Sequence, residues 1–131
     1  MRRAVLALTG GALAAGIVMF GAGAAQAHPL GNFTINHYDG LRFSKGLVKD
    51  LAVVDSAEIP TVQERPMVDE DGDGVVSVAE RSAHAVSACA DLAQAVQLSV
   101  NGTRVPFTLQ NSSFEYQAGA AGLETSRLEC A

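Results

Sequence analysis

Residues 69–96 have the sequence DEDGDGVVSVAERSAHAVSACADLAQAV, which contains the two patterns that decide the fold. The first six residues, DEDGDG, consist of carboxylates and glycines, and a further carboxylate, Glu80, closes the twelve-residue stretch. The remainder places apolar side chains at helical spacing, on one stripe formed by Val78, Ala85, Cys89, Leu92 and Val96. The sequence therefore predicts an acidic loop at 69–80 that leads directly into the main helix, 78–96.

The twelve residues of this acidic loop match the EF-hand calcium loop. Alternate positions supply carboxylate oxygens, and Gly74 permits the sharp turn that wraps the chain around an ion. Glu70 is not expected to be a ligand, and Val76 would hold the loop against the core. The expected ligands are Asp69, Asp71, Asp73, the backbone carbonyl of Val75, Ser77 directly or through water, and Glu80 in bidentate fashion.

Two features limit this match. Pro66 lies shortly before the loop, so the incoming helix of a standard helix-loop-helix is not expected to be regular. The loop is also single, which fits the weak extracellular class of calcium site better than a tight buffer. The competing interpretation is an acidic, solvated turn without an ion.

The rest of the chain alternates in the manner of short strands. Strands are predicted at 33–38 and 47–54, with Asp39-Gly40 as a turn, and any helix between Pro60 and Pro66 should be short. Asn101-Gly102 predicts a hairpin of 98–100 with 105–109, which Pro106 confines to a sheet edge. Further strands are predicted at 113–117 and 123–130. The expected fold is α+β, a small β-rich domain of hairpins with one main helix after the calcium loop.

The first 27 residues have the pattern of a secretory signal peptide. Arg2 and Arg3 precede an uncharged stretch, 4–20, and the small residues that follow suit signal peptidase. Cleavage is expected between Ala27 and His28, which leaves an extracytoplasmic domain, 28–131. A retained membrane anchor is the alternative, although it needs about 20 apolar residues.

Composition excludes several classes of function. The chain has 131 residues, with 9 basic and 14 acidic side chains and a pI near 5.0, and it contains no run of Lys and Arg. A nucleic-acid partner is therefore not expected. Neither a phosphate-binding glycine loop nor a nucleophile with an adjacent base is visible, so the chain is not expected to be an enzyme.

The two cysteines and two of the histidines suggest further sites. Export would carry Cys89 and Cys130 into a compartment where disulfides persist, so a bond between them is expected, with two free buried thiols as the alternative. The new terminus at His28 would offer an amine and an imidazole to nickel or copper, and His37 could add a third nitrogen. Alternatively, both histidines are ordinary residues, and His84 is expected to be solvated on the polar helix face.

As a set, several segments give the chain a resemblance to a family. These are the acidic loop, 28–36 (HPLGNFTIN), 57–61 (AEIPT), 63–66 (QERP) and 122–130 (GLETSRLEC). They resemble the extracytoplasmic N-terminal region of actinobacterial membrane proteins described as nickel/cobalt transporter-like. The resemblance implies a domain outside the membrane that accompanies a transporter portion.

This chain stops at Ala131 without the membrane helices of that family, so transport is not assigned to its residues, and a truncated product or partial gene is one interpretation. The expected function is a secreted or membrane-associated calcium-binding module. The alternative is a transition-metal domain that uses His28.

Overall fold

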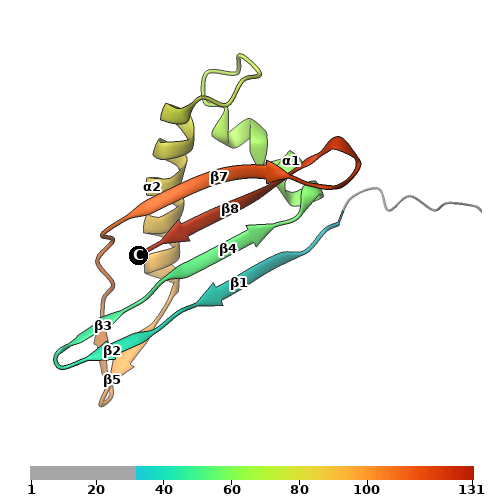
Figure 1. Cartoon of the computed structure of the whole chain (residues 1–131). Coiled ribbons are helices and arrows are strands. Elements are labelled where there is room, and N and C mark those ends of the chain that lie inside the picture. The colour runs from blue at the N-terminus through green and yellow to red at the C-terminus, as the bar shows by residue number, and fades with distance from the viewer. Residues whose placement is uncertain (1–31) are drawn as a thin grey trace, which may run out of the picture.

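The computed structural model describes residues 32–131 (Figure 1), so the expected cleavage between Ala27 and His28 lies outside the described residues. Strands and helices are both present, which confirms an α+β fold. The elements are β1 (Ile35–Asp39), β2 (Arg42–Ser44), β3 (Leu47–Lys49), β4 (Ala52–Ser56), α1 (Glu58–Val68), α2 (Val78–Ala95), β5 (Leu98–Val100), β6 (Thr103–Val105), β7 (Ser112–Ala118), the short 3₁₀ turn η1 (Ala120–Gly122) and β8 (Glu124–Cys130).

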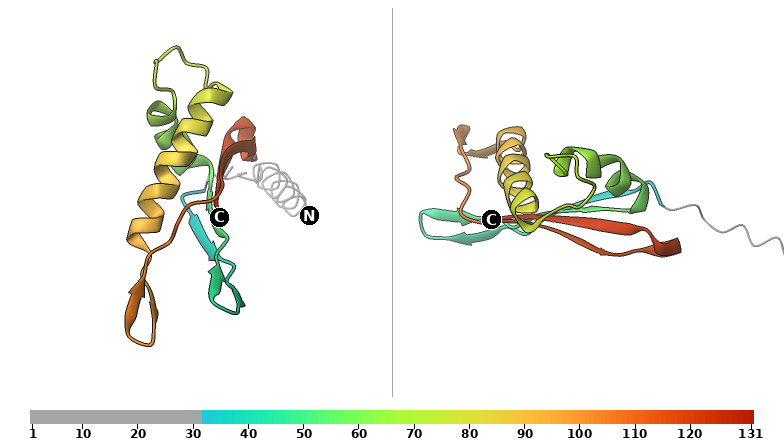
Figure 2. Two further views of the ribbon diagram at one scale, coloured as in Figure 1. Left: turned by 90° about the vertical axis from the view of Figure 1, so that its left-hand side faces the viewer. Right: turned by 90° about the horizontal axis from the view of Figure 1, so that it is seen from above.

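The main sheet has four antiparallel strands in the order β1-β4-β8-β7. It consists of two hairpins, β1–β4 and β7–β8, that meet where β4 pairs with β8. Val54 lies opposite both His37 and Leu128, which fixes the register across three strands. Both helices pack on one face of this sheet, α2 over β7 and β8 and α1 over β8 and β4 (Figure 2).

The core lies between α2 and the middle of the sheet. Ala85 and Cys89 on α2 are fully buried, and they face Phe114 on β7 and Leu128 on β8. A disulfide joins Cys89 to Cys130 with a Cα–Cα distance of 5.5 Å, so the expected pairing is confirmed and α2 is bonded to the central strand. Val78, in contrast, is 69% exposed, so its predicted place on the buried stripe is wrong.

The predicted turn at Asp39-Gly40 is wrong. The backbone groups of Gly40 and Leu51 bond to each other in both directions, which continues the β1–β4 ladder beyond this point. The chain instead turns at Gly46, whose φ of +73° favours glycine. The predicted strand 47–54 is accordingly divided into β3 and β4 around Asp50.

The predicted end of the first helix before Pro66 is also wrong. Helix α1 begins at Glu58 and runs through both prolines to Val68. Pro60 occupies the first turn, where a backbone N–H has no helical partner anyway. Pro66 gives up one bond, the one that an N–H there would donate to the Val62 carbonyl, while the Asp69 N–H still donates to Arg65. The acidic loop is therefore flanked by helices on both sides.

Two two-stranded ribbons, β2–β3 and β5–β6, extend from the same end of the molecule as separate prongs (Figure 2). Asn101 and Gly102 both have positive φ, 49° and 80°, which confirms the predicted hairpin turn. Strand β6 is Thr103–Val105, so the predicted return strand 105–109 is wrong except at Val105. Within 32–131, no helix has the length and apolarity needed to cross a membrane.

Candidate metal centre in the acidic loop

The acidic loop is held at both ends by ordinary helix-terminal contacts. Val68, the last residue of α1, is 1% exposed, and the Asp69 N–H donates to the Arg65 carbonyl at 2.9 Å. At the other end Ser77 caps α2, because its hydroxyl accepts the Glu80 N–H at 3.2 Å. The loop is thus anchored to the core through the helices that flank it.

Three aspartates converge within this loop. Oxygens of Asp69, Asp71 and Asp73 all lie within 4.8 Å of one another. Each aspartate also accepts a backbone N–H of the loop: Asp69 Oδ2 from Gly74 at 2.9 Å, Asp71 Oδ1 from Asp73 at 3.1 Å, and Asp73 Oδ1 from Val75 at 2.7 Å. Each carboxylate therefore uses one oxygen for the turn and retains the other.

One of these remaining oxygens is in an unusual position. Asp69 Oδ1 is shielded from solvent and has no hydrogen-bond partner among the described residues. A buried carboxylate oxygen without a partner is costly, because it has lost its water and gained nothing in exchange. A cation held by the three aspartates would remove that cost.

Glu80 crosses the loop, but it is not one of the three converging carboxylates. Its Oε2 accepts the Ser77 N–H at 2.7 Å, which completes a capping box, and its Oε1 accepts the N–H groups of Glu70 and Asp71 at 2.9 and 3.3 Å. These bonds, that from Ser77 first, lower the pKa of Glu80. The S-x-x-E pattern at Ser77 was the available sequence signal for this cap.

The remaining loop residues differ in their surroundings. Val76 is half-buried and packs against the core cluster, as expected from its apolar position in the loop. Val75 is 67% exposed, and its N–H is turned to Asp73. Of the expected ligands, Asp69, Asp71 and Asp73 are brought together, whereas Glu80 is engaged by backbone donors.

The structure does not bring together the second predicted metal site, that of His28 and His37. His28 lies outside the described residues, and His37 is exposed on β1. Within the part of the chain that the structure describes, the aspartate cluster is the one group of three or more His, Cys, Asp or Glu side chains close enough to share an ion.

His84 is not solvated, contrary to the expectation from its place on the helix. Its side chain is 17% exposed, its Nε2 lies 3.0 Å from Glu64 Oε1, and its ring packs edge-on against Phe114 at 4.6 Å. A polar face was expected here because helical spacing alone does not show that α1 covers this side of α2. The contact depends on Glu64 of α1, and the sequence of α2 gives no sign of it.

Glu64 also belongs to a chain of hydroxyl contacts that the sequence did not indicate. The Ser126 hydroxyl donates to Glu64 Oε2 at 3.3 Å and lies 3.2 Å from the Thr61 hydroxyl, which donates to the Ser56 carbonyl. Both hydroxyl residues are almost fully buried, and the histidine contacts the far side of the carboxylate. The arrangement links α1, α2 and β8.

Comparison with known proteins identifies no relative: no family model, no curated protein and no solved structure matches this chain.

Proposed function

We propose that the acidic loop, 69–80, binds one calcium ion and that the chain is a non-catalytic, extracytoplasmic calcium-binding module. The observation that carries the proposal is the convergence of three aspartates to within 4.8 Å, and it is supported by a shielded oxygen of one of them, Asp69 Oδ1, that has no partner among the described residues. Calcium prefers carboxylate and carbonyl oxygens in a flexible arrangement, which this loop offers.

The loop carries more negative charge than it can neutralise by itself. Asp69, Asp71 and Asp73 would supply one oxygen each, with the Val75 carbonyl and Ser77 as further neutral ligands. Glu80 would complete the shell after exchanging its backbone donors for the ion. A divalent cation would offset the mutual repulsion of these carboxylates.

The surroundings of the loop support a module outside the cytoplasm. The Cys89–Cys130 disulfide is of the kind that persists in oxidising compartments, and no described helix is long and apolar enough to cross a membrane. We propose that the module accompanies a membrane transporter portion, as the family resemblance implies.

The experiment is a calcium titration followed by calorimetry and thermal unfolding. One ion per chain should bind and raise the melting temperature, because the ion binds only the folded loop. At ten times Kd the gain should be about 1.4 kcal/mol. Magnesium should act more weakly, since it demands a tighter octahedral shell. A calcium concentration of about 10 mM is roughly ten times the weakest Kd of the extracellular class. If it leaves both readouts unchanged, the loop is a solvated turn.

Matched variants separate the ion from general electrostatics. Asp71→Asn removes one converging carboxylate, so calcium affinity should fall steeply while the ion-free protein gains stability through reduced repulsion. Glu70→Gln removes one negative charge at the adjacent residue, which is outside the converging group, and should change calcium affinity little. Equal losses in the two variants would contradict a site built on named ligands.

A further inference from the structure

The two ribbons form a chemically distinct end of the molecule, called here the hairpin end and defined as residues 41–51 and 97–107. It holds four of the seven basic side chains among the described residues: Arg42, Lys45, Lys49 and Arg104. None of these four forms an ion pair there, whereas Arg65, Arg81 and Arg127 all pair with carboxylates. Asp50 is the one acidic residue of the hairpin end. Within residues 32–131, the cations without an ion-pair partner thus lie together at one end.

Two of these cations oppose each other directly. Arg42 is the cross-strand partner of Lys49 in the β2–β3 ribbon. Like charges at directly opposed positions destabilise a strand pair, and no carboxylate lies within ion-pair distance to relieve them in the described structure. An anionic partner would remove this repulsion.

Apolar side chains are interleaved with the cations. Residues 42–49 have the sequence RFSKGLVK, in which Phe43 is 72% and Leu47 51% exposed. Val100 and Val105 on the second ribbon are also exposed. Soluble proteins seldom leave such groups together in water without a partner.

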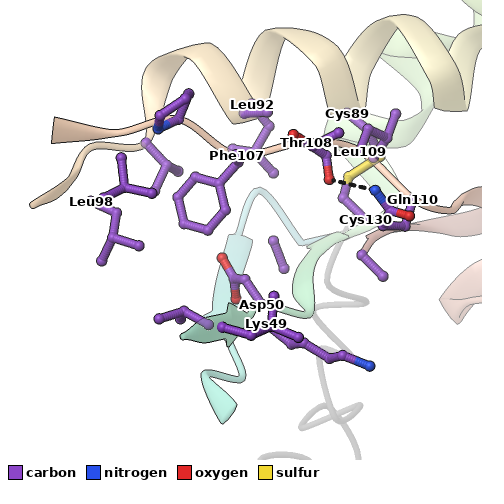
Figure 3. Close-up of a pocket in the computed structure, with 18 of the residues that line it drawn as sticks. Lys49, Asp50, Cys89, Leu92, Leu98, Phe107, Thr108, Leu109, Gln110 and Cys130 are labelled. Atoms are coloured by element: carbon purple, nitrogen blue, oxygen red, sulfur yellow. Dashed lines mark hydrogen bonds between the residues drawn. A yellow bond between two sulfur atoms is a disulfide. The ribbon is translucent and has the colours of Figure 1, made fainter. Parts of the chain in front are cut away.

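An open apolar groove of about 1000 Å³ separates the two ribbons (Figure 3). Leu98 and Phe107 line it from the second ribbon and the segment after it, and Leu92 lines it from α2. Asp50 lies on the opposite wall, where burial and the nearby charge of Asp39 raise the pKa of its carboxyl group. The groove is therefore mainly apolar, and Lys49 is the one cation of the hairpin end that lines it.

We propose that the hairpin end docks on the surface of a bilayer containing anionic phospholipid. Lipid phosphates would meet the four cations, Phe43 and Leu47 would enter the interface, and acyl chains would cover the groove. Basic residues interleaved with apolar ones are typical of elements that lie in the membrane interface. An acidic protein partner would satisfy the cations but would leave the projecting Phe43 without an apolar environment.

This proposal is independent of calcium. The acidic loop lies at the opposite end of α2, a helix of 18 residues that spans about 27 Å. Docking by the hairpin end would therefore hold the acidic loop away from the bilayer.

The absence of tryptophan from the sequence provides a clean test. Phe43→Trp places a single indole on the β2–β3 ribbon, and Phe33→Trp is its matched control, because Phe33 is equally exposed, at 71%, and lies at the other end of the sheet. The chain as recovered from expressing cells is mixed with vesicles of phosphatidylcholine, with or without about one-third phosphatidylglycerol. With the anionic vesicles, emission of Phe43→Trp should shift to the blue and be quenched by brominated acyl chains, and Phe33→Trp should not respond.

Charge variants made in the Phe43→Trp background test the role of the cations. The triple variant Arg42→Gln, Lys45→Gln, Lys49→Gln should weaken the fluorescence response about 100-fold, about fivefold for each charge. Gln63→Glu, Ser87→Glu, Gln117→Glu changes the net charge equally at exposed positions elsewhere and should weaken it far less. Unchanged thermal unfolding of each variant verifies that it folds.

Three outcomes would overturn membrane docking. The first is no response of Phe43→Trp to either vesicle, and the second is an equal response to neutral vesicles. The third is binding of soluble polyglutamate that competes with the vesicles while the indole stays in water, which would assign the hairpin end to an acidic protein.

Discussion

Glu58 is the residue on which three separate segments depend. It is 7% exposed, and its Oε1 accepts the Ala120 N–H at 2.8 Å while its Oε2 accepts the Asn32 N–H at 3.0 Å. Gly119 leaves room for it, since a Cβ there would lie 3.0 Å from the Glu58 side chain. One carboxylate thus connects the approach to β1, the start of α1 and the turn before β8.

Stability should depend on pH through this carboxylate. The bond from the Ala120 N–H, followed by other backbone donors, lowers the pKa of Glu58 below its ordinary value of 4.5. The unfolded chain therefore takes up this proton first, so the stabilisation is complete above the ordinary pKa and is lost as pH falls through the folded pKa. Glu58→Gln should lower the melting temperature at pH 7 and flatten its fall between pH 5 and pH 3. Parallel melting curves for the two proteins would contradict this role.

Phe114 should be the most sensitive single position of the core. Its side chain is 3% exposed and stacks edge-on against both His84, at 4.6 Å, and Tyr116, at 5.2 Å. Phe114→Ala should cost about 3–5 kcal/mol of unfolding free energy, because it leaves a cavity under α2. Phe33→Ala, at a 71% exposed position, should change stability by less than about 0.5 kcal/mol. Denaturant unfolding measures both, and similar losses would place the core elsewhere.

Among the elements, β8 is the best connected, and α2 is the helix that packs most extensively on the sheet. The disulfide joins them covalently, and α2 also packs over β7. Helix α1 contributes mainly polar contacts, through Thr61 and Glu64 to Ser126 of β8.

Removal of the disulfide should therefore weaken the domain without changing its fold. The double variant Cys89→Ala, Cys130→Ala should lose about 2–5 kcal/mol, since the bond closes a loop across 41 residues of sequence separation. Guanidinium unfolding measures the loss, and reductant should reproduce it in the natural chain while leaving the double variant unaffected. A natural chain insensitive to reductant would contradict a stabilising bond.

The sequence predicted elements wherever local pattern and tertiary packing agree. Asn101-Gly102 can adopt positive φ, so its turn was predictable, and the apolar spacing around Cys89 predicted α2. The pattern failed at Pro66, where it predicted the end of the helix, because a proline so near the end of α1 removes one hydrogen bond without stopping the helix. It failed at His84 because the neighbour that buries it, Glu64, lies on another helix. In the site, spacing predicted the three aspartates together, but it did not reveal that Glu80 is engaged by backbone donors.

The described part of the molecule has a well-packed centre and two ribbons that project from one end. The sheet and α2 share the buried residues, whereas the β2–β3 and β5–β6 ribbons are each only two strands wide and largely exposed. An isolated two-stranded ribbon is only marginally stable in water. Structural order should therefore be least secure at the hairpin end.

Hydrogen exchange should follow this division. Amides of β8, which is paired on both sides, should exchange slowest, and those of β2, β3, β5 and β6 should exchange orders of magnitude faster through local opening. Mass spectrometry of peptic fragments resolves the two groups. Equal protection of residues 42–49 and 124–130 would show that the ribbons open only with the whole domain.

The central position of β8 also determines when the domain can form during synthesis. The hairpin β1–β4 is translated early, yet the inner partner of β4 is residues 126–130, which are made after every other described strand and helix. The disulfide likewise waits for Cys130. Until then the nascent chain has an incomplete sheet with an open edge, so the domain should stay unfolded until β8 has been synthesised. Such a delay keeps a polypeptide in the threadable state that a secretion channel accepts.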